Sequence, residues 1–238
     1  MRMKLIYFVM HMTGAATPRP LRAVIFMGST RAKRVGDRVT AQLVGAMRER
    51  AWHTETIDPR SSHDGFFMRL LEKPLFHYKP GEDVPAALTA TAASITSADA
   101  VVVCSPEMNH TLAPGLVNVM SHFGSSLFAH KPAGIATYSA GNWGGARAGV
   151  ALRPFLSELG CLPVSATWQL ARAWKAFGDD GALRDADGAD GKTLQRMLDQ
   201  LEWHASAMRA HRDAFGESGP SYYEQVAAKS TSSPAGGD

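Results

Sequence analysis

The stretch "VIFMGSTRAKRVGDRV" (Val24–Val39) joins an apolar run to a basic loop and then to a helical pattern. The run from Leu21 to Met27 is short and continuous, which is typical of a strand buried on both faces. An amphipathic helix from about 36 to 50 is predicted by apolar residues at every fourth position: Val35, Val39, Leu43 and Met47. The stretch therefore predicts the first strand and helix of an alternating α/β chain.

The same alternation continues along the chain. Strands are predicted at 52–58, 99–105, 132–139 and 162–168, of which "DAVVVCS" (Asp99–Ser105) has the clearest pattern of a buried strand. Helices are predicted at about 85–98, from Pro114 onward, over a stripe at 152–159, and around 194–201. Pro154 should kink its helix or delay the start, and 59–83 is predicted to be an irregular surface excursion. Five alternations indicate a five-stranded parallel sheet with helices on both faces.

Composition narrows the classes of function. The 238 residues are 45% hydrophobic and 20% charged, with a net charge of +3, so nothing global favours nucleic acid or an anionic membrane as partner. No apolar run reaches the 18 residues of a membrane span. Cys104 and Cys161 are far apart, and "GDDGALRDADGADG" lacks the ligand spacing of a calcium loop. We therefore expect no metal site, no nucleic acid and no membrane as partners.

The ends of the chain differ in composition from its middle. Residues 1–20 are expected to be a disordered extension, with Met1, Met10 and Met12 as alternative starts, and 216–238 a disordered low-complexity tail. The domain is then 21–215. The N-terminal apolar run is short for a signal peptide, and Cys104 is expected to be a reduced, buried thiol. Both features favour a cytoplasmic protein.

A basic loop at 28–36 follows the first strand. It lacks the second glycine of a Walker phosphate-binding loop and the spacing of a dinucleotide GxGxxG motif. It does offer hydroxyls and arginines at a helix N-terminus, where free N–H groups and the helix dipole favour a phosphate. The alternative is a solvated basic turn, but its position after the first strand of an alternating sheet favours phosphate binding.

Two further loops, 105–111 and 139–147, also follow predicted strands. Because the carboxyl ends of parallel strands share one edge of the sheet, all three loops should converge there. In the second loop, Glu107 and His110 are candidate acid–base groups, and an ordinary turn explains them equally well. In the third, "SAGNWGGAR" would let the backbone approach a planar ligand, although a flexible turn with Trp143 covering core is the alternative.

Taken together, the three loops resemble those of the NAD(P)H-dependent FMN reductase family of flavodoxin-like flavoproteins. The resemblance runs from Ala23 to Leu170 through "GSTRAKRVG", "SPEMNHTLAPGLVNVM" and "YSAGNWGGARAGVALRPFLSELG". It implies a flavodoxin-like doubly wound fold with bound FMN, and NADPH or NADH as electron donor. It also implies a ping-pong reaction with quinones, azo compounds, metal oxyanions or free flavin, in a homodimer or homotetramer.

The resemblance assigns site residues to each loop. The FMN phosphate would be held by Ser29, Thr30, Arg31, Arg34 and Gly36, and the ring lined by Pro106, Glu107, Met108 and Asn109. The polar edge of the ring would face Ser139, Gly141, Gly144 and Gly145. Met108 departs from the family's usual tyrosine, and no catalytic acid or base is assigned because the chemistry belongs to the flavin. Two alternatives remain: an electron-carrier or interaction module without its own NAD(P)H turnover, and a phosphate-binding protein without flavin.

Overall fold

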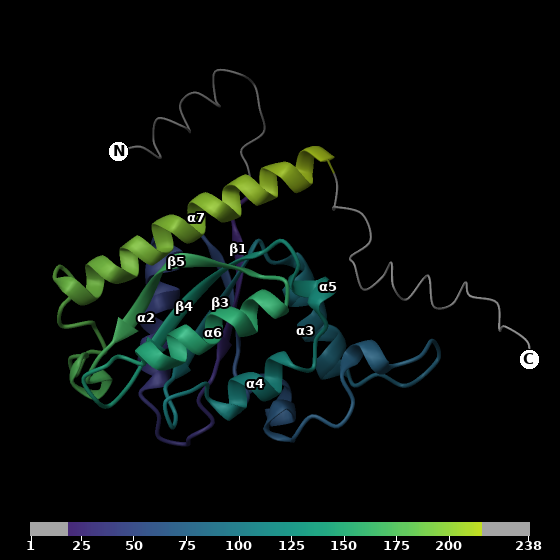
Figure 1. Cartoon of the computed structure of the whole chain (residues 1–238), viewed down its shortest axis with the longest axis horizontal. Coiled ribbons are helices and arrows are strands. Elements are labelled where there is room, and N and C mark those ends of the chain that lie inside the picture. The colour runs from purple at the N-terminus through teal and green to yellow at the C-terminus, as the bar shows by residue number, and fades with distance from the viewer. Residues whose placement is uncertain (1–18, 216–238) are drawn as a thin grey trace, which may run out of the picture.

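The computed structural model describes residues 19–215, which form one parallel five-stranded sheet between two layers of helices (Figure 1). The strands are β1 (Arg22–Met27), β2 (His53–Ile57), β3 (Ala100–Pro106), β4 (Pro132–Tyr138) and β5 (Leu162–Leu170). The predicted sheet and its five strands are confirmed, with ends that shift by one or two residues. The predicted tails, 1–20 and 216–238, lie almost wholly outside the described residues.

The strand order is β2-β1-β3-β4-β5, the flavodoxin-like order. All four pairings are parallel. The chain runs outward from β1 to β2 and then crosses back to β3, so the direction of winding reverses between β1 and β3. Ligands of such sheets bind beyond the carboxyl ends of the strands at this reversal, and the loops after β1 and β3 are therefore the first place to look for a site.

Helices cover both faces of the sheet. On one face, α2 (Gly36–Glu49) and α7 (Ala189–Phe215) pack their apolar sides on a core that includes Leu43, Trp168 and Leu198. The other face is covered by α3 (Ala86–Ser97), α4 (Pro114–Met120), α5 (Ser125–Phe128) and α6 (Ala146–Glu158). Three short 3₁₀ segments complete the described chain: Ser62–Met68, Leu75–His77 and Ala173–Lys175.

Helix α6 corrects the expectation that Pro154 delays its helix, because α6 begins at Ala146 and contains Pro154. Proline lacks the N–H that would bond the carbonyl four residues earlier. That carbonyl belongs to Val150, which is exposed, so water can satisfy it. A helix that starts early can thus pass through Pro154.

The segment 59–83 is only partly the surface excursion that its sequence predicts. Phe67 is fully buried in the core beside α4, and Asn118 of α4 holds the segment through both ends of its amide. The Asn118 amide nitrogen donates to the carbonyls of Phe67 and Arg69, and its oxygen accepts from the Leu71 N–H. This part of the segment belongs to the domain core.

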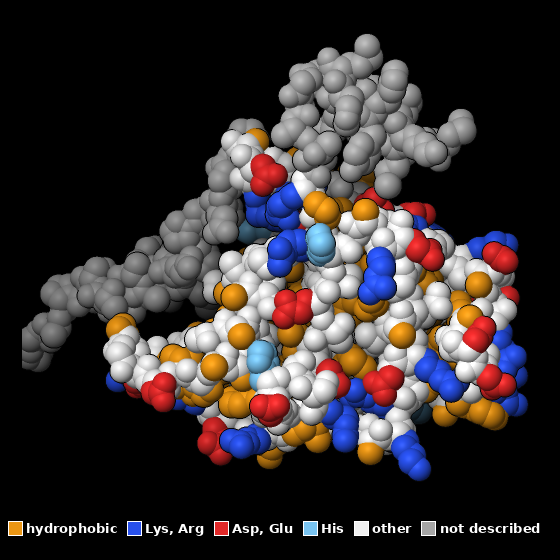
Figure 2. Space-filling model, turned by 180° about the vertical axis from the view of Figure 1, so that it is seen from behind, with side chains coloured by type: hydrophobic (Ala, Val, Ile, Leu, Met, Phe, Trp, Pro, Cys, Tyr) orange, Lys and Arg blue, Asp and Glu red, His pale blue; other side chains and the backbone are white. Residues whose placement is uncertain are grey.

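The surface carries charges of both signs. On the face seen in Figure 2, acidic and basic side chains are interspersed, in keeping with the small net charge. Among residues 19–215, no helix is long and apolar enough to cross a membrane, and no group of three or more His, Cys, Asp or Glu side chains could hold a metal ion. Both cysteines are buried free thiols, and burial raises the pKa of each to about 12, which leaves them unreactive.

Candidate functional site

The three loops converge at the carboxyl edge of the sheet, as the sequence predicts. A Cβ atom at Gly28 would lie 2.7 Å from the Ser105 hydroxyl, so the first loop packs directly on the second. Gly115, at the start of α4, would meet the Thr30 side chain at 2.5 Å. The third loop joins the second through an ion pair between Arg147 and Glu107. These contacts make one rigid edge out of three segments.

The first loop presents unused backbone donors. Within residues 19–215, no backbone N–H from Ser29 to Asp37 donates a hydrogen bond to the protein. The start of α2 has no side-chain cap either. A row of free N–H groups at the N-terminus of a 14-residue helix is a site for an anion, because the helix dipole adds to the donors. This arrangement fits the phosphate of FMN.

Arg34 organises this loop from within. Its Nη1 donates to Oδ1 of Asp58 at 2.8 Å and to the carbonyl of Ser29, and its Nε donates to Asp37 at 2.8 Å. Its Nη2 bonds the second oxygen of Asp58. Burial disfavours the charged form of Asp58, but the Arg34 guanidinium, the Arg60 N–H and the Ser61 hydroxyl together outweigh it and lower the pKa of that carboxyl. Since four of its five N–H donors are occupied, Arg34 shapes the loop more than it contacts a ligand.

The other cations of the loop are available for an anion. Arg31 and Lys33 are exposed and form no ion pair with any described carboxylate. Arg60 donates to the carbonyl of Thr30 at 3.0 Å and so ties the loop to the segment after β2. The sequence assigned both Arg31 and Arg34 to the phosphate. In the structure Arg31 is exposed, whereas Arg34 is enclosed by its own partners.

Tyr138 is the last residue of β4, and its side chain reaches the first loop at Gly36. Its hydroxyl is buried and has no hydrogen-bond partner among the described residues, and it faces Gly36 and the side of Ser29. Burial raises the pKa of Tyr138, so it stays a neutral phenol. A Cβ atom at Gly36 would overlap this hydroxyl. The glycine thus permits the close approach of α2 to β4, and an unsatisfied donor lies at the same place.

We expect Gly36→Ala to push α2 away from β4 and to weaken FMN retention at least tenfold. The double variant Gly36→Ala/Tyr138→Phe removes the overlapping oxygen and should recover most of the retention. Equilibrium dialysis against free FMN measures both. If the single variant retains FMN as well as the wild type, the close approach has no part in binding.

Glu107 links the second loop to the third. Its Oε2 accepts from the backbone N–H of Arg147 at 3.0 Å, and its Oε1 accepts from the Arg147 guanidinium, with Nε at 2.8 Å. Burial disfavours the carboxylate, but these donors outweigh it, so the pKa of Glu107 lies below its usual range. Glu107 therefore caps the start of α6 as an anion at neutral pH, and this geometry does not support a role as proton donor there.

This cap should make stability depend on pH. A carboxyl whose pKa is lowered by folding stabilises above its unfolded value of about 4.5, and this stability is lost as the pH falls through the folded pKa. We expect the melting temperature of Glu107→Gln to be lower than that of the wild type at pH 7 and the two to approach each other below pH ~4. Calorimetry from pH 7 downward measures the difference, and a constant gap would contradict the cap.

The tip of the second loop is a tight turn. Met108 and Thr111 bond each other through both backbone pairs, at 3.1 and 2.9 Å. The two central residues, Asn109 and His110, have φ of 47° and 61°, as a type I′ turn requires. Met108 is thereby held as a half-buried side chain at the edge where the three loops meet.

Histidine is an unfavourable residue for this backbone, whereas asparagine tolerates it. We expect His110→Gly to raise the free energy of unfolding by about 1 kcal/mol and Asn109→Gly to change it less. Chemical denaturation of both variants checks this. A loss of stability in His110→Gly would mean that the His110 side chain makes a stabilising contact of its own.

The third loop divides into a packed part and an open part. Gly144 and Gly145 have φ of 58° and 79°, and a Cβ atom at Gly145 would lie 2.8 Å from Thr137. By contrast, Gly141 has open space around it, and Ser139 is only half-buried. Trp143 is 68% exposed, so the alternative that it covers core is wrong. Of the four predicted residues, Ser139 and Gly141 are the two that the surrounding chain leaves accessible.

Three residues of the site escaped the sequence interpretation: Asp58, Arg60 and Tyr138. Asp58 and Tyr138 stand at or just after the carboxyl ends of predicted strands, the position that the fold rule marks. That signal was present for both. Nothing in the sequence alone indicates that Asp58, rather than a ligand, would take the side chain of Arg34.

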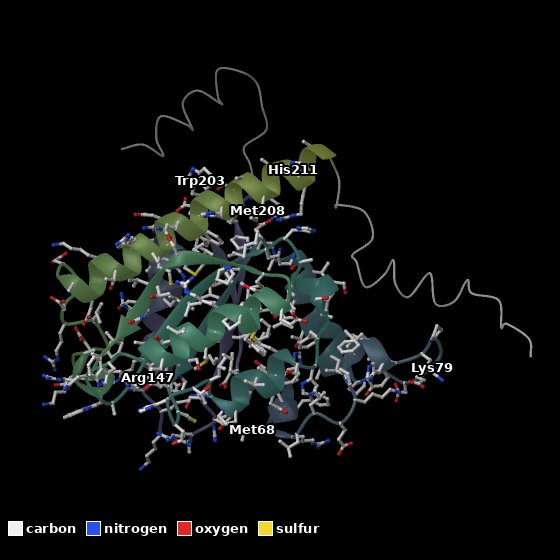
Figure 3. The ribbon with its side chains drawn as sticks, viewed as in Figure 1. Met68, Lys79, Arg147, Trp203, Met208 and His211 are labelled. Carbon is white, nitrogen blue, oxygen red and sulfur yellow. The ribbon has the colours of Figure 1, made fainter. Side chains whose placement is uncertain are left out.

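The site fits FMN on the chain's own chemistry. It combines free N–H donors for a dianion, a buried donor without a partner, and an apolar side chain, Met108, at the meeting point of the loops. Its outer edge carries Arg147, which Figure 3 shows at the lower left of the molecule, far from Trp203 on α7. Ser29 lies next to Gly36 at the start of α2, and the first loop meets the second where Gly28 packs on Ser105.

Comparisons with known proteins agree with this arrangement. Residues 21–175 match the family model of NADPH-dependent FMN reductases. An NADPH azoreductase of Bacillus sp. (strain OY1-2) is 30% identical over 77 residues, which are 32% of this chain and 43% of that protein. The chain therefore matches less than half the length of this curated relative.

Solved structures share the fold at low identity. FerB, a flavoenzyme NAD(P)H:(acceptor) oxidoreductase from Paracoccus denitrificans, is 22% identical with a TM-score of 0.59, over 77% of this chain and 98% of its own. An NADH:FMN oxidoreductase (EMOB) is 15% identical with a TM-score of 0.56, over 79% and 89%. The match to the family model covers most of the chain and includes all three loops, and the chain is accordingly a member of the NADPH-dependent FMN reductase family of flavoprotein oxidoreductases.

Proposed function

We propose that the protein is an NAD(P)H-dependent FMN-containing oxidoreductase that passes electrons from NAD(P)H to a small-molecule acceptor such as a quinone, an azo compound, a metal oxyanion or free flavin. The observation that carries this proposal is the single edge at which three loops meet, with free N–H groups on one side and open loops on the other. When bound, FMN supplies the hydride and electron chemistry.

The chain's own residues bind and position. The N–H groups from Ser29 to Asp37, with Arg31 and Lys33 outside them, hold a phosphate. Arg34 and Asp58 keep this loop in shape, and Glu107 fixes the start of α6. None of these groups is set up to exchange a proton near neutral pH, because Glu107 and Asp58 have lowered pKa values and Tyr138 a raised one. This supports a reaction without an essential acid or base from the protein.

Steady-state kinetics test the proposal. NADPH plus a proton reduces a benzoquinone to the hydroquinone, and the loss of NADPH absorbance reports the rate. We expect turnover that requires FMN and gives parallel double-reciprocal lines, because donor and acceptor use the same edge in turn. Intersecting lines would contradict the ping-pong order. FMN binding with no NADPH oxidation would contradict the enzyme and favour an electron-carrier module.

We also propose a homodimer or homotetramer in the cytoplasm, with quinone reduction among its activities. Several large apolar side chains are exposed, including Leu70, Phe76 and Trp203, and exposed apolar groups of this size favour association. The two free buried thiols suit a reducing compartment. Light scattering with size-exclusion chromatography tests the assembly, and a monomer at micromolar concentration would contradict it.

A further inference from the structure

The segment that follows β5 is built onto the third loop. The Arg172 N–H donates to the carbonyl of Gly141 at 2.8 Å, and the Ala173 N–H donates to the carbonyl of Ser139 at 3.0 Å. Ala173 is buried in the core, so the short turn Ala173–Lys175 is anchored. The segment that carries Arg172, Trp174 and Lys175 is therefore joined to the third loop by backbone hydrogen bonds.

Two exposed indoles flank this region, and each has a cation over its ring. Trp174 is 60% exposed with Lys175 Nζ 4.6 Å from its ring centre. Trp143 has the Arg147 guanidinium 6.0 Å from its ring. Exposure of a tryptophan ring to water is energetically unfavourable. Exposed indoles with neighbouring cations therefore suit a planar aromatic ligand that carries negative charge.

The basic residues of the region differ in what neutralises them. Arg147 is paired with Glu107, and Arg153 donates to the carbonyls of Val164 and Ser165 on β5. Arg172 donates through Nε to the neutral amide oxygen of Asn142 at 2.6 Å, and its two terminal nitrogens have no partner within the part of the chain that the structure describes. Lys175 forms no ion pair within residues 19–215. Arg172 and Lys175 thus carry two positive charges without an ion-pair partner among the described residues, Lys175 over the Trp174 ring and Arg172 against Asn142 of the third loop.

Two acidic residues that follow, Asp180 and Asp185, form no ion pair with Arg172 or Lys175 among the described residues. Asp180 accepts from the backbone of Ala182 at 3.0 Å, and Asp185 accepts from the backbone N–H of Asp190 at 3.0 Å, at the start of α7. Both carboxylates are occupied by their own turns.

We propose that Arg172, Lys175 and Trp174 bind the adenosine 2′-phosphate of NADPH and so make the protein prefer NADPH to NADH. Adenine is the planar partner for Trp174. The 2′-phosphate is a dianion that matches the fork of Arg172 and the point charge of Lys175. The rest of the dinucleotide then runs along the exposed third loop toward the meeting point of the loops. The inference rests on the proposed function and identifies the 2′-phosphate as the group of the electron donor that the site recognises.

A binding experiment tests this without turnover. Isothermal titration of the FMN-loaded protein with adenosine 2′,5′-bisphosphate and with adenosine 5′-monophosphate should show the first binding at least tenfold more tightly. Arg172→Gln and Lys175→Gln should each remove most of this difference. Trp174→Ala should weaken both ligands, and Trp174→Phe should retain them. Equal affinity of the wild type for the two ligands would overturn the proposal.

Arg153→Gln is the matched control. It also removes one arginine charge, but Arg153 lies in α6 and donates to carbonyls of β5 rather than to the third loop. It should leave the affinity for the bisphosphate within twofold of the wild type. If it weakens binding as much as Arg172→Gln, the effect is general electrostatics and the assignment is wrong.

Kinetics separate this inference from the proposed function. Arg172→Gln should raise KM for NADPH at least tenfold while KM for NADH changes less than twofold. If the wild type oxidises neither donor, the proposed function fails, and the titration still decides the inference by itself. If the wild type oxidises both donors with the same KM, the function stands and the inference fails.

Discussion

Asp58→Asn is expected to lower the free energy of unfolding by about 2 kcal/mol and to weaken FMN retention at least tenfold. Asp58 accepts two hydrogen bonds from the enclosed guanidinium of Arg34, and it also accepts from the Arg60 N–H at 3.0 Å and the Ser61 hydroxyl at 2.7 Å. Removal of its charge leaves Arg34 without its main partner. The two side chains are only 7% and 11% exposed, so water can replace little of the lost interaction.

Asp37→Asn is the control for this variant. Asp37 also accepts from Arg34, but its side chain is 58% exposed, so we expect a change below about 0.5 kcal/mol. Urea denaturation and equilibrium dialysis against FMN measure stability and retention for both variants. Equal effects of the two substitutions would contradict the role given to Asp58.

Asp99→Asn is expected to lower the free energy of unfolding by about 3 kcal/mol and to leave FMN affinity unchanged. The Asp99 side chain is only 1% exposed and accepts from Arg19 at 2.8 and 3.0 Å and from Arg212 at 3.0 Å. Arg209 lies 4.0 Å away. One carboxylate thus holds three arginines, two of them near the end of α7, and its loss leaves them facing one another.

Because of where Asp99 lies, its loss should lower stability without changing FMN affinity. It precedes β3 at the amino end of the sheet, opposite the edge where the three loops meet. Asp199→Asn is the control, because Asp199 pairs with Arg50 at the surface and its loss should cost little. Thermal unfolding measures the stability of both variants, and FMN titration measures their affinity for the cofactor. A weaker FMN affinity in Asp99→Asn would show that the two edges are coupled.

The fold could be predicted because its signals are local. Apolar runs such as 99–105 and the four-residue spacing in 36–50 reflect burial on both faces of a sheet and on one face of a helix, and neither needs a distant partner. The late start that Pro154 suggested was wrong because a helix can continue through a proline where the residue four positions earlier is exposed, as Val150 is. Phe67 misled because an irregular segment can still be drawn into the core by one residue and by the amide of Asn118.

The site could be predicted only in outline. The positions of the loops follow from topology, so their meeting at one edge was foreseeable. The roles of individual side chains at this edge could not be foreseen, because they depend on partners that are distant in the sequence. Arg34 meets Asp58, Glu107 meets Arg147, and Tyr138 meets Gly36, and none of these separations leaves a mark in sequence spacing. Arg31 forms no ion pair among the described residues, and its assignment to the phosphate stays a prediction.

The central claim is that the edge formed by the three loops holds FMN. The most direct measurement is the visible absorption spectrum of the purified protein, followed by chromatography of the cofactor released by heat, with Gly36→Ala measured alongside. We expect a flavin band and release of FMN from the wild type, and a much weaker band from the variant. A colourless wild type that also fails to take up added FMN would contradict it.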